Sequence, residues 1–399
     1  MPTAAFVFFC LFYISGVHQS CVDAWGREGH MIIANVAYER LRVESRALVG
    51  EILGFGEVTD NNESDPLNST PLSHVANWAD AVRFTRAYHW SGALHYVDIK
   101  DSYISGGCPC TRPITTLTSA HQGSSNSKYC TIGVAESLCN FSIERDCPSS
   151  FCAVGAISNF THRLMTNAKG GRFDDVGVIN TSIRGTSRRQ TRNTSPTSES
   201  EQKWRRKEAL MFLTHLVGDL HQPLHSSRKS DVGGNSIKVY FNVSTSNDDS
   251  TVQWYYGSMS PPSLPSDRFE KRSHWNLHSV WDSGIIEKAI EETHHRSPLG
   301  FQQSIHDMVG LAESSGLLDE WLRCSDTRTT FCPSIWAEES LADALRWSYS
   351  TESGNEVVSG AWLSEDYFET RLHVVMRRLA AAGVRLAAVL EASLQVIGA

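Results

Sequence analysis

The chain has 399 residues, of which 41% are hydrophobic, and a formal net charge of −8. This is enough apolar material to bury a large core, so the composition excludes a disordered or fibrous protein. With 44 acidic against 36 basic residues, the chain also lacks the basic excess of many nucleic-acid binders. Composition alone therefore does not point to an enzyme that acts on nucleic acid.

The N-terminus begins with an apolar run from Ala4 to Val17. This run is too short to span a bilayer but has the length of a signal-peptide core. Small side chains then precede Trp25 at the positions that a signal peptidase reads. We predict that residues 1–24 are a signal peptide, that the mature chain starts at Trp25, and that the protein is secreted or held in the secretory-pathway lumen. The alternative is a buried helix or an uncleaved anchor.

Apolar side chains recur with helical spacing along most of the mature chain. This predicts helices over 31–53, 71–88, 153–165, 204–220, 279–291, 300–318, 337–346 and 364–397, with Gly383 as a break in the last one. Pro223 ends the helix over 204–220. Only 236–243 has the pattern of a strand. The predicted fold class is therefore mainly α: residues 25–399 form a single-domain helical bundle with long disulfide-stapled loops and a minor β-hairpin.

Removal of residues 1–24 leaves an even set of eight cysteines, as expected for disulfides in an oxidising compartment. Zinc-thiolate sites are the weaker interpretation, because the Cys108–Cys110 spacing is too tight. Seven N-glycosylation sequons agree with export, so we expect N-linked glycans. They lie at Asn62, Asn68, Asn140, Asn159, Asn180, Asn193 and Asn242. The most apolar tail, 379–399, is interrupted by Arg385 and Glu391, so we expect no membrane insertion, and we expect a monomer.

Two long polar segments, 101–140 and 169–203, have the composition of inserted loops. The second contains several arginines, among them Arg184, Arg188, Arg189 and Arg192. These could steer nucleic acid towards a site. A solvated, flexible insertion is the favoured interpretation, because the basic run lacks interleaved aromatic residues.

Two histidine–aspartate pairs dominate the candidate chemistry. His215 and Asp219 are four residues apart, as are His278 and Asp282. This spacing places each pair on one helical face. The neighbouring residues are apolar, so the pairs are expected to be buried and to need polar partners. Imidazole and carboxylate groups are zinc ligands, so a metal site inside a helix bundle would supply those partners.

Other candidate ligands lie outside these two pairs. Asp80 and His95 add a carboxylate and an imidazole among apolar neighbours, and each alone has the pattern of an ordinary core or cap residue. Cleavage before Trp25 would place a free amine five residues from His30. An α-amino group has a pKa of about 7.7–8.0, so its neutral, metal-binding form is accessible near neutral pH.

Ordered motifs then establish a resemblance that covers the whole mature chain. They run from WGREGH through HVANWAD, LHYVD, ERDCPSSFC, FLTHLVGDLHQPLH and DVGGNSIKV to NLHSVWDSGI. The chain resembles the secreted zinc-dependent single-strand nucleases of fungi and plants and the trypanosomatid class I 3′-nucleotidase/nucleases, which are related to bacterial zinc phospholipase C. The segments 101–140 and 169–203 are longer than in the compact members of the family. The resemblance implies the helical fold of the phospholipase C/nuclease type.

The resemblance also implies three Zn²⁺ ions with nine protein ligands. One ion would be held by Asp80, His95, His215 and Asp219, and a second by His225, His278 and Asp282. The third would be held by the amine and carbonyl of Trp25, by His30 and by Asp219, which is thereby shared.

The implied activity is hydrolysis of single-stranded RNA and DNA to 5′-nucleotides and removal of phosphate from 3′-nucleotides. A hydroxide bridging the close metal pair would attack phosphorus. Asp219 would bind both zinc ions of that pair, and Arg83 would neutralise the negative charge of the transition state. Tyr96 would stack on a nucleobase and Asn235 would hydrogen-bond it. Within the ERDCPSSFC motif, Cys147 and Cys152 are the favoured disulfide, and the pairing of the other six cysteines stays open.

Two alternative functions remain open at this point. The first is a zinc-dependent phospholipase C, because the same metal cage would serve it. The second is a non-catalytic secreted protein that binds zinc, which would be distinguished by a closed coordination shell without water.

Overall fold

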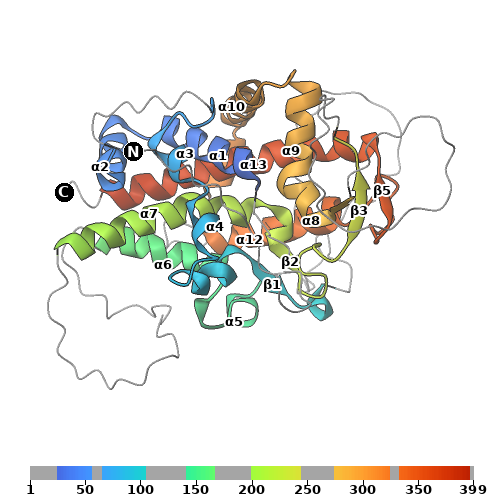
Figure 1. Ribbon diagram of the computed structural model, residues 1–399, viewed down its shortest axis with the longest axis horizontal. Coiled ribbons are helices and arrows are strands. Elements are labelled where there is room, and N and C mark those ends of the chain that lie inside the picture. Colours follow the sequence, from blue (N-terminus) through green and yellow to red (C-terminus); the bar gives the residue numbers. More distant parts are fainter. Residues whose placement is uncertain are drawn as a thin grey trace, which may run out of the picture.

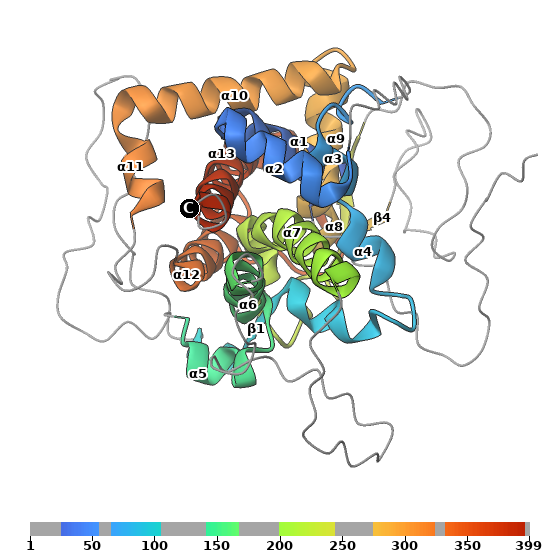
Figure 2. The same cartoon turned by 90° about the vertical axis from the view of Figure 1, so that its left-hand side faces the viewer.

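The computed structural model describes residues 25–55, 65–104, 141–166, 199–243, 274–323 and 332–395. Its helices form a bundle that runs the length of the molecule (Figure 1). Seen end-on, α1, α6, α7, α12 and α13 lie side by side, and α10 crosses one side of the bundle (Figure 2). The predicted mainly α fold is therefore confirmed. The predicted signal peptide and nearly all of the two inserted loops lie outside the described residues.

Each predicted helical range contains helix, in the predicted order, but the described residues form thirteen α-helices because several ranges are divided; 31–53, for example, is two helices, α1 and α2. They are α1 (Arg27–Arg40), α2 (Val43–Leu53), α3 (Pro71–Val75), α4 (Trp78–Val82), α5 (Ile143–Asp146), α6 (Ala153–Thr166), α7 (Glu199–His221), α8 (Leu277–Ser279), α9 (Ile285–Lys288), α10 (Pro298–Ser315), α11 (Leu317–Leu322), α12 (Pro333–Asp343) and α13 (Glu365–Gln395). Short 3₁₀ turns lie at η1 (His89–His95), η2 (Asp101–Tyr103), η3 (Pro148–Ser150) and η4 (Pro223–His225). Three π-helical turns are η5 (Val280–Gly284), η6 (Ala289–Thr293) and η7 (Ala344–Ser348).

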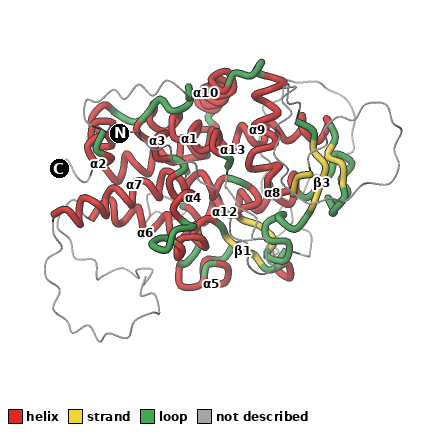
Figure 3. Tube along the Cα trace, viewed as in Figure 1, coloured by secondary structure: helices red, strands yellow, loops and turns green. Residues whose placement is uncertain are grey.

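The strands are short and form two small sheets, which lie at separate places on the bundle (Figure 3). β1 (Val97–Ile99) pairs in parallel with β2 (Ser226–Arg228), with Val97 opposite Ser226. In the second sheet, β3 (Lys238–Phe241) lies between antiparallel β4 (His274–Asn276) and parallel β5 (Ala361–Leu363). Only β3 was predicted. The other four strands have three residues each, too few to show a two-residue alternation.

The predicted helix over 71–88 is instead two helices, α3 and α4, that meet at Ala76 and Asn77. The carbonyl of Ala76 accepts a hydrogen bond from Nδ1 of His215 (2.7 Å) at this junction. The interruption therefore places backbone against a candidate ligand, which a continuous helix would not do.

Gly383 is not the predicted break, because α13 continues through it. A Cβ atom at Gly383 would lie 2.5 Å from Cγ1 of Val36 in α1. Glycine is needed here because the two helices approach closely at this point. The prediction of a break was wrong because a glycine that permits close packing looks the same in a sequence as one that ends a helix.

A buried ionic network joins α12, α13 and the C-terminal end of α7. The guanidinium groups of Arg378 and Arg385 both bond Glu339, at 2.8 and 2.5 Å. Nε of Arg378 donates to the carbonyl of His221 (3.0 Å), and the Ser340 hydroxyl donates to the carbonyl of Leu220 (2.5 Å). Carbonyls at the end of a helix lack partners within it, so this network caps α7 just after Asp219.

Replacing Glu339 with glutamine is expected to lower the free energy of unfolding at pH 7 by about 2–3 kcal/mol, because two buried guanidinium groups lose their counter-charge. Burial opposes ionisation of Glu339, but Arg385 and Arg378 outweigh it and hold the pKa below the ordinary 4.5. A carboxyl group whose pKa is lowered by folding stabilises the fold fully when the pH is above the ordinary pKa. This contribution to the free energy of unfolding is lost progressively as the pH falls below that pKa. Urea unfolding at pH 7 and pH 3.5 should therefore show a difference that shrinks at the lower pH, and Glu369→Gln on the exposed side of α13 should show none.

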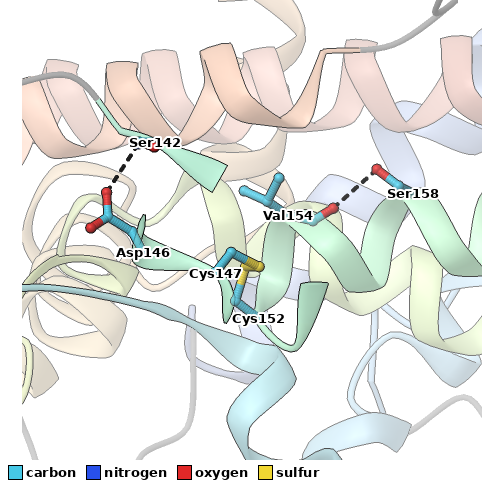
Figure 4. The surroundings of a disulfide bond; sticks show 6 residues. All are labelled: Ser142, Asp146, Cys147, Cys152, Val154 and Ser158. Carbon is cyan, nitrogen blue, oxygen red and sulfur yellow. Dashed lines mark hydrogen bonds between the residues drawn. A yellow bond between two sulfur atoms is a disulfide. The ribbon is translucent and has the colours of Figure 1, made fainter. Parts of the chain in front are cut away.

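Cys147 and Cys152 form a disulfide that closes the turn before α6 (Figure 4). The carboxylate of Asp146 accepts a hydrogen bond from the backbone NH of Ser142 (3.0 Å) beside it. The NH of Ala153 donates to the carbonyl of Tyr96 (3.1 Å), so the disulfide-closed turn lies against the segment that carries His95 and Tyr96. Cys332 is also disulfide-bonded, and the other mature cysteines lie outside the described residues.

Candidate metal centre

Eight buried histidine and aspartate side chains lie together where α1, α4, η1, α7, η4, α8 and η5 meet. They are His30, Asp80, His95, His215, Asp219, His225, His278 and Asp282. Their side-chain ligand atoms form three groups in which every atom lies within 4.8 Å of the others. The groups are His30 with Asp80 and His215; His95 with His215 and Asp219; and His225 with His278 and Asp282.

The carboxylate of Asp219 is the centre of the larger part of this site. Its Oδ1 lies 3.2 Å from Nε2 of His30 and 3.3 Å from Nε2 of His215. Its Oδ2 lies 2.8 Å from Nδ1 of His95. One buried carboxylate therefore faces three imidazoles that come from three different elements. Its two oxygens can serve two ions at once.

The second carboxylate of this part comes from Asp80 in α4. Its Oδ2 lies 3.4 Å from Nε2 of His215, and its Oδ1 lies 3.5 Å from Nδ1 of His95. His215 therefore stands between the two carboxylates, and its ring stacks on that of His30 at 3.9 Å between centroids.

His225 and His278 face each other in the smaller part of the site. Nδ1 of His225 bonds the carbonyl of His95 (2.7 Å), and Nδ1 of His278 bonds the carbonyl of Gly233 (2.6 Å). A carbonyl only accepts, so each Nδ1 carries the hydrogen and each neutral ring has an acceptor at Nε2. Yet these two Nε2 atoms are 3.1 Å apart, and Oδ2 of Asp282 is 3.3 Å from Nε2 of His278. Three acceptors that face one another could hold a cation between them.

The same pattern recurs at His215, whose Nδ1 bonds the Ala76 carbonyl while Nε2 faces the carboxylates. Among the residues that the structure describes, Nε2 of His30, Nε2 of His215 and Oδ1 of Asp219 are buried without a hydrogen-bond partner. Buried polar atoms are normally paired, so these atoms fit a bound metal ion.

The pKa values of the imidazoles depend on the balance between burial and the neighbouring carboxylates. Burial alone would lower the pKa of His215, but the carboxylates of Asp219 and Asp80 outweigh it and raise the pKa to about 9. Burial dominates at His30 and His278 and lowers their pKa values to about 4 and about 3. Those two rings are therefore neutral at physiological pH, which is the form that binds metal.

Trp25 is fully buried, and the residue that follows it contacts the turn that carries Asp282. The NH of Gly26 donates to the carbonyl of Asp282 (2.7 Å), and a Cβ at Gly26 would lie 2.4 Å from Oγ of Ser283. The residues around Trp25 are therefore packed tightly against the π-helical turn that carries Asp282. This packing brings position 25 to the site.

The candidate substrate residues lie around the buried groups. Arg83 is buried, with NH1 3.0 Å from Oδ1 of Asp80, and its guanidinium lies over the ring of Phe84 (4.9 Å). Tyr96, next to His95, is 40% exposed. Asn235 is partly exposed and donates from Nδ2 to the carbonyl of Val232 (2.8 Å). None of these three is itself in a ligand group.

Sequence patterns did not indicate Gln222, which is fully buried beside the smaller ligand group. Its Nε2 donates to Oδ1 of Asp282 (2.5 Å), and its Oε1 accepts from the NH of Leu224 (2.5 Å). It thus orients a candidate ligand while it shapes the turn that leads to His225. The available signal was a glutamine in an otherwise apolar stretch between two histidines of one motif.

The donor set narrows the choice of metal. Imidazole and carboxylate groups in a buried, helix-lined site suit zinc, whereas calcium and magnesium prefer all-oxygen sites. Because the three groups are adjacent and two of them share His215, ions bound there would lie close together. Such an arrangement can hold a phosphate ester between metals.

Comparison with known proteins agrees with this chemistry. A family model described as S1/P1 nuclease matches residues 25–251 and 263–395, a range that includes all the candidate ligands. Endonuclease 2 of Arabidopsis thaliana is 29% identical over 375 residues, which cover 93% of this chain and 90% of that protein. Nuclease P1 of Penicillium citrinum is 25% identical over 366 residues, covering 91% and 95%. Nuclease S1 of Aspergillus oryzae is 23% identical over 370 residues, covering 92% and 91%.

Proposed function

Since the chain belongs to the S1/P1 nuclease family, we propose that it is a secreted zinc enzyme that hydrolyses single-stranded RNA and DNA to 5′-nucleotides. We propose further that it removes phosphate from 3′-nucleotides at the same site. The observation that carries the proposal is the set of buried imidazole and carboxylate acceptors that face one another around Asp219 and His278. Bound cations would stabilise that arrangement, and a cation cluster is suited to the hydrolysis of a phosphate ester.

One of the proposed ligand sets coincides with a group in the structure, and the other two combine members of the remaining groups. One Zn²⁺ is held by the carboxylates of Asp80 and Asp219 and by the imidazoles of His95 and His215. A second takes His225, His278 and Asp282, which form a group of their own. The third takes His30, Asp219 and the amine and carbonyl of Trp25; the 3.2 Å approach of His30 to Asp219 supports it.

Bound zinc supplies a Lewis acid and lowers the pKa of water from 15.7 to about 7. The other tasks belong to the chain's own residues. Asp219 and Asp80 place negative charge in a buried site beside the imidazoles. This charge would attract cations to the imidazole nitrogens. Arg83 is buried against Asp80, where a guanidinium can neutralise charge that develops on the phosphorane.

Tyr96 and Asn235 would select the substrate. The ring of Tyr96 is partly exposed beside His95, so a nucleobase can stack on it next to the metals. Asn235 lies in the turn that also contacts His278 and can bond the edge of that base. Stacking of this kind requires an unpaired base, which favours single strands over duplexes.

The negative net charge of the chain does not argue against a phosphate substrate once bound cations are counted. Removal of Asp23 with the signal peptide changes the net charge from −8 to −7, and three Zn²⁺ add +6, which gives about −1. Phosphate would therefore be attracted by the metal cluster itself. A basic surface is not needed for that attraction.

We propose that the mature enzyme spans residues 25–399 as one domain and starts at Trp25. The start of the family match at residue 25 and the burial of Trp25 support this. No helix in the described part of the chain is long and apolar enough to cross a membrane. The proposed location is outside the cell or in the secretory-pathway lumen, with N-linked glycans on a monomer.

The purified mature protein is expected to degrade single-stranded RNA and DNA at least tenfold faster than the matching duplexes, because stacking on Tyr96 needs an exposed base face. It should also release phosphate from a 3′-nucleotide but not from the 5′-isomer. Phosphatidylcholine in the same panel tests the phospholipase C alternative. Hydrolysis of the lipid alone would overturn the proposal, and zinc binding without turnover of any substrate would favour a zinc-binding protein.

A further inference from the structure

The turn formed by residues 231–235 has an unusual backbone. Val232, Gly233 and Gly234 all have positive φ angles, of 56°, 61° and 82°. Valine is β-branched and rarely adopts this conformation, so the backbone is strained at this position. The side chain of Val232 is 60% exposed, so core packing does not hold it there. Other contacts must therefore maintain the turn.

Backbone NH groups of Val232 and Gly233 donate to the carbonyls of Lys229 and Arg228, and the side chain of Asp231 supplies further contacts. Its Oδ1 accepts a hydrogen bond from the NH of Gly234 (2.7 Å) and another from the hydroxyl of Tyr349 (2.9 Å). Tyr349 is buried at the end of η7, and the guanidinium of Arg228 covers its ring at 4.3 Å. Asp231 thus connects the strained turn, through Tyr349, to the helical bundle at the end of η7.

The opposite side of the turn touches a candidate ligand. The carbonyl of Gly233 accepts the hydrogen bond from Nδ1 of His278 at 2.6 Å. A Cβ at Gly233 would lie 2.6 Å from the carbonyl oxygen of Leu224 and 3.3 Å from Nδ1 of His278. The peptide of Gly233 is therefore pressed against the imidazole, and its carbonyl decides which nitrogen of His278 carries the hydrogen.

From this geometry we propose that Asp231, supported by Tyr349, is a positioning residue: it holds the Gly233 carbonyl that keeps Nε2 of His278 free to bind metal. This inference rests on the proposed function in one respect, namely that His278 binds zinc. Groups that orient a ligating histidine typically change metal affinity by about 10–100-fold when they are removed. Asp231 does not touch the ligand group itself, so its effect passes through Gly233.

The alternative is that Asp231 only stabilises the fold, as an ordinary turn residue would. The two roles differ in how Asp231 couples to His278. A purely structural residue lowers stability equally with and without His278, because effects at independent sites add. A positioning residue loses its zinc-dependent effect once His278 is removed.

The experiment is a double-mutant cycle with Asp231→Ala, His278→Ala and the double variant. Each purified protein is dialysed against a weak chelator, its zinc content is measured, and its thermal midpoint is recorded with and without added zinc. We expect Asp231→Ala to retain one zinc fewer than the wild type and to bind that ion about 10–100-fold more weakly. We expect the double variant to match His278→Ala in zinc content and in the zinc-dependent part of the midpoint.

Three further variants sharpen the test. Asp231→Asn keeps an acceptor oxygen and should restore zinc affinity to within about threefold of wild type. Tyr349→Phe removes one donor to Asp231 and should weaken zinc by less than Asp231→Ala, which gives a result even where the alanine variant fails to fold. Asp307→Ala, on the exposed side of α10, is the matched control and should change nothing.

The inference is overturned where Asp231→Ala and Tyr349→Phe both retain the full zinc content at wild-type affinity. It is also overturned where Asp231→Ala changes the zinc-dependent midpoint equally in both backgrounds. Nuclease activity of the wild type, assayed in parallel, separates the two claims. An inactive wild type that loads zinc contradicts the proposed function but leaves the zinc readouts to decide the role of Asp231.

Discussion

Replacing Asp219 with asparagine is expected to reduce nuclease activity by about 10³-fold or more and to release two of the three proposed zinc ions together. The side chain keeps its size but loses its charge, while His30, His95 and His215 still surround it. Removing one partner of a buried charged group costs about 3–5 kcal/mol, which corresponds to about 10²–10⁴ in rate when the group acts in the transition state. Activity on single-stranded RNA and zinc content by elemental analysis measure the two effects.

The loss of two ions is the sharper part of this prediction, because only a shared carboxylate produces it. Asp307→Asn, on exposed α10, removes the same charge far from the ligands in sequence and should keep full activity and zinc. An Asp219→Asn protein that folds, keeps all its zinc and turns over substrate at more than a tenth of the wild-type rate would contradict a bridging role for Asp219.

Stripping the metal with a strong chelator is expected to abolish activity and to lower the thermal midpoint of the same sample. Without cations, the acceptor atoms of His225 and His278 face each other at 3.1 Å, and the carboxylates of Asp80 and Asp219 lie together in a buried site. When the free metal concentration is about a thousandfold above the dissociation constant, binding adds about 4 kcal/mol to the free energy of unfolding. Removing the metal removes this contribution. Calorimetry and an RNA digestion assay follow both losses.

Added zinc should restore both properties, and added magnesium should restore neither, because the ligands are mostly imidazoles. Asp219→Asn gives the matched control: chelator should shift its midpoint less than that of the wild type. Full activity and an unchanged midpoint after thorough chelation would show that the three groups do not need cations.

Much of the fold could be predicted from sequence because the long helices contain many apolar positions. α6, α7 and α13 have 14, 23 and 31 residues, and all three were predicted. The strands beside the bundle were not, since β1, β2, β4 and β5 have three residues each. The break between α3 and α4 was also missed, because it depends on a contact between Ala76 and His215 that local sequence does not contain.

The ligand groups could be predicted for a related reason. Histidine and aspartate four residues apart share a helical face, and this spacing alone pairs His215 with Asp219 and His278 with Asp282. Which pairs meet across the bundle came from the family resemblance and not from spacing. Gln222 and Asp231 were missed, because a residue that orients a ligand leaves no periodic signal and is recognised only by its contacts.

The central claim is that three adjacent histidine–aspartate groups hold zinc and that this cluster performs the hydrolysis. The most direct measurement is anomalous X-ray diffraction at the zinc edge from crystals of the active, purified protein. The account predicts three peaks: one between Asp80, His95, His215 and Asp219, one between His225, His278 and Asp282, and one between His30, Asp219 and the main chain of Trp25. An active protein whose crystals show no peak at these groups would contradict it.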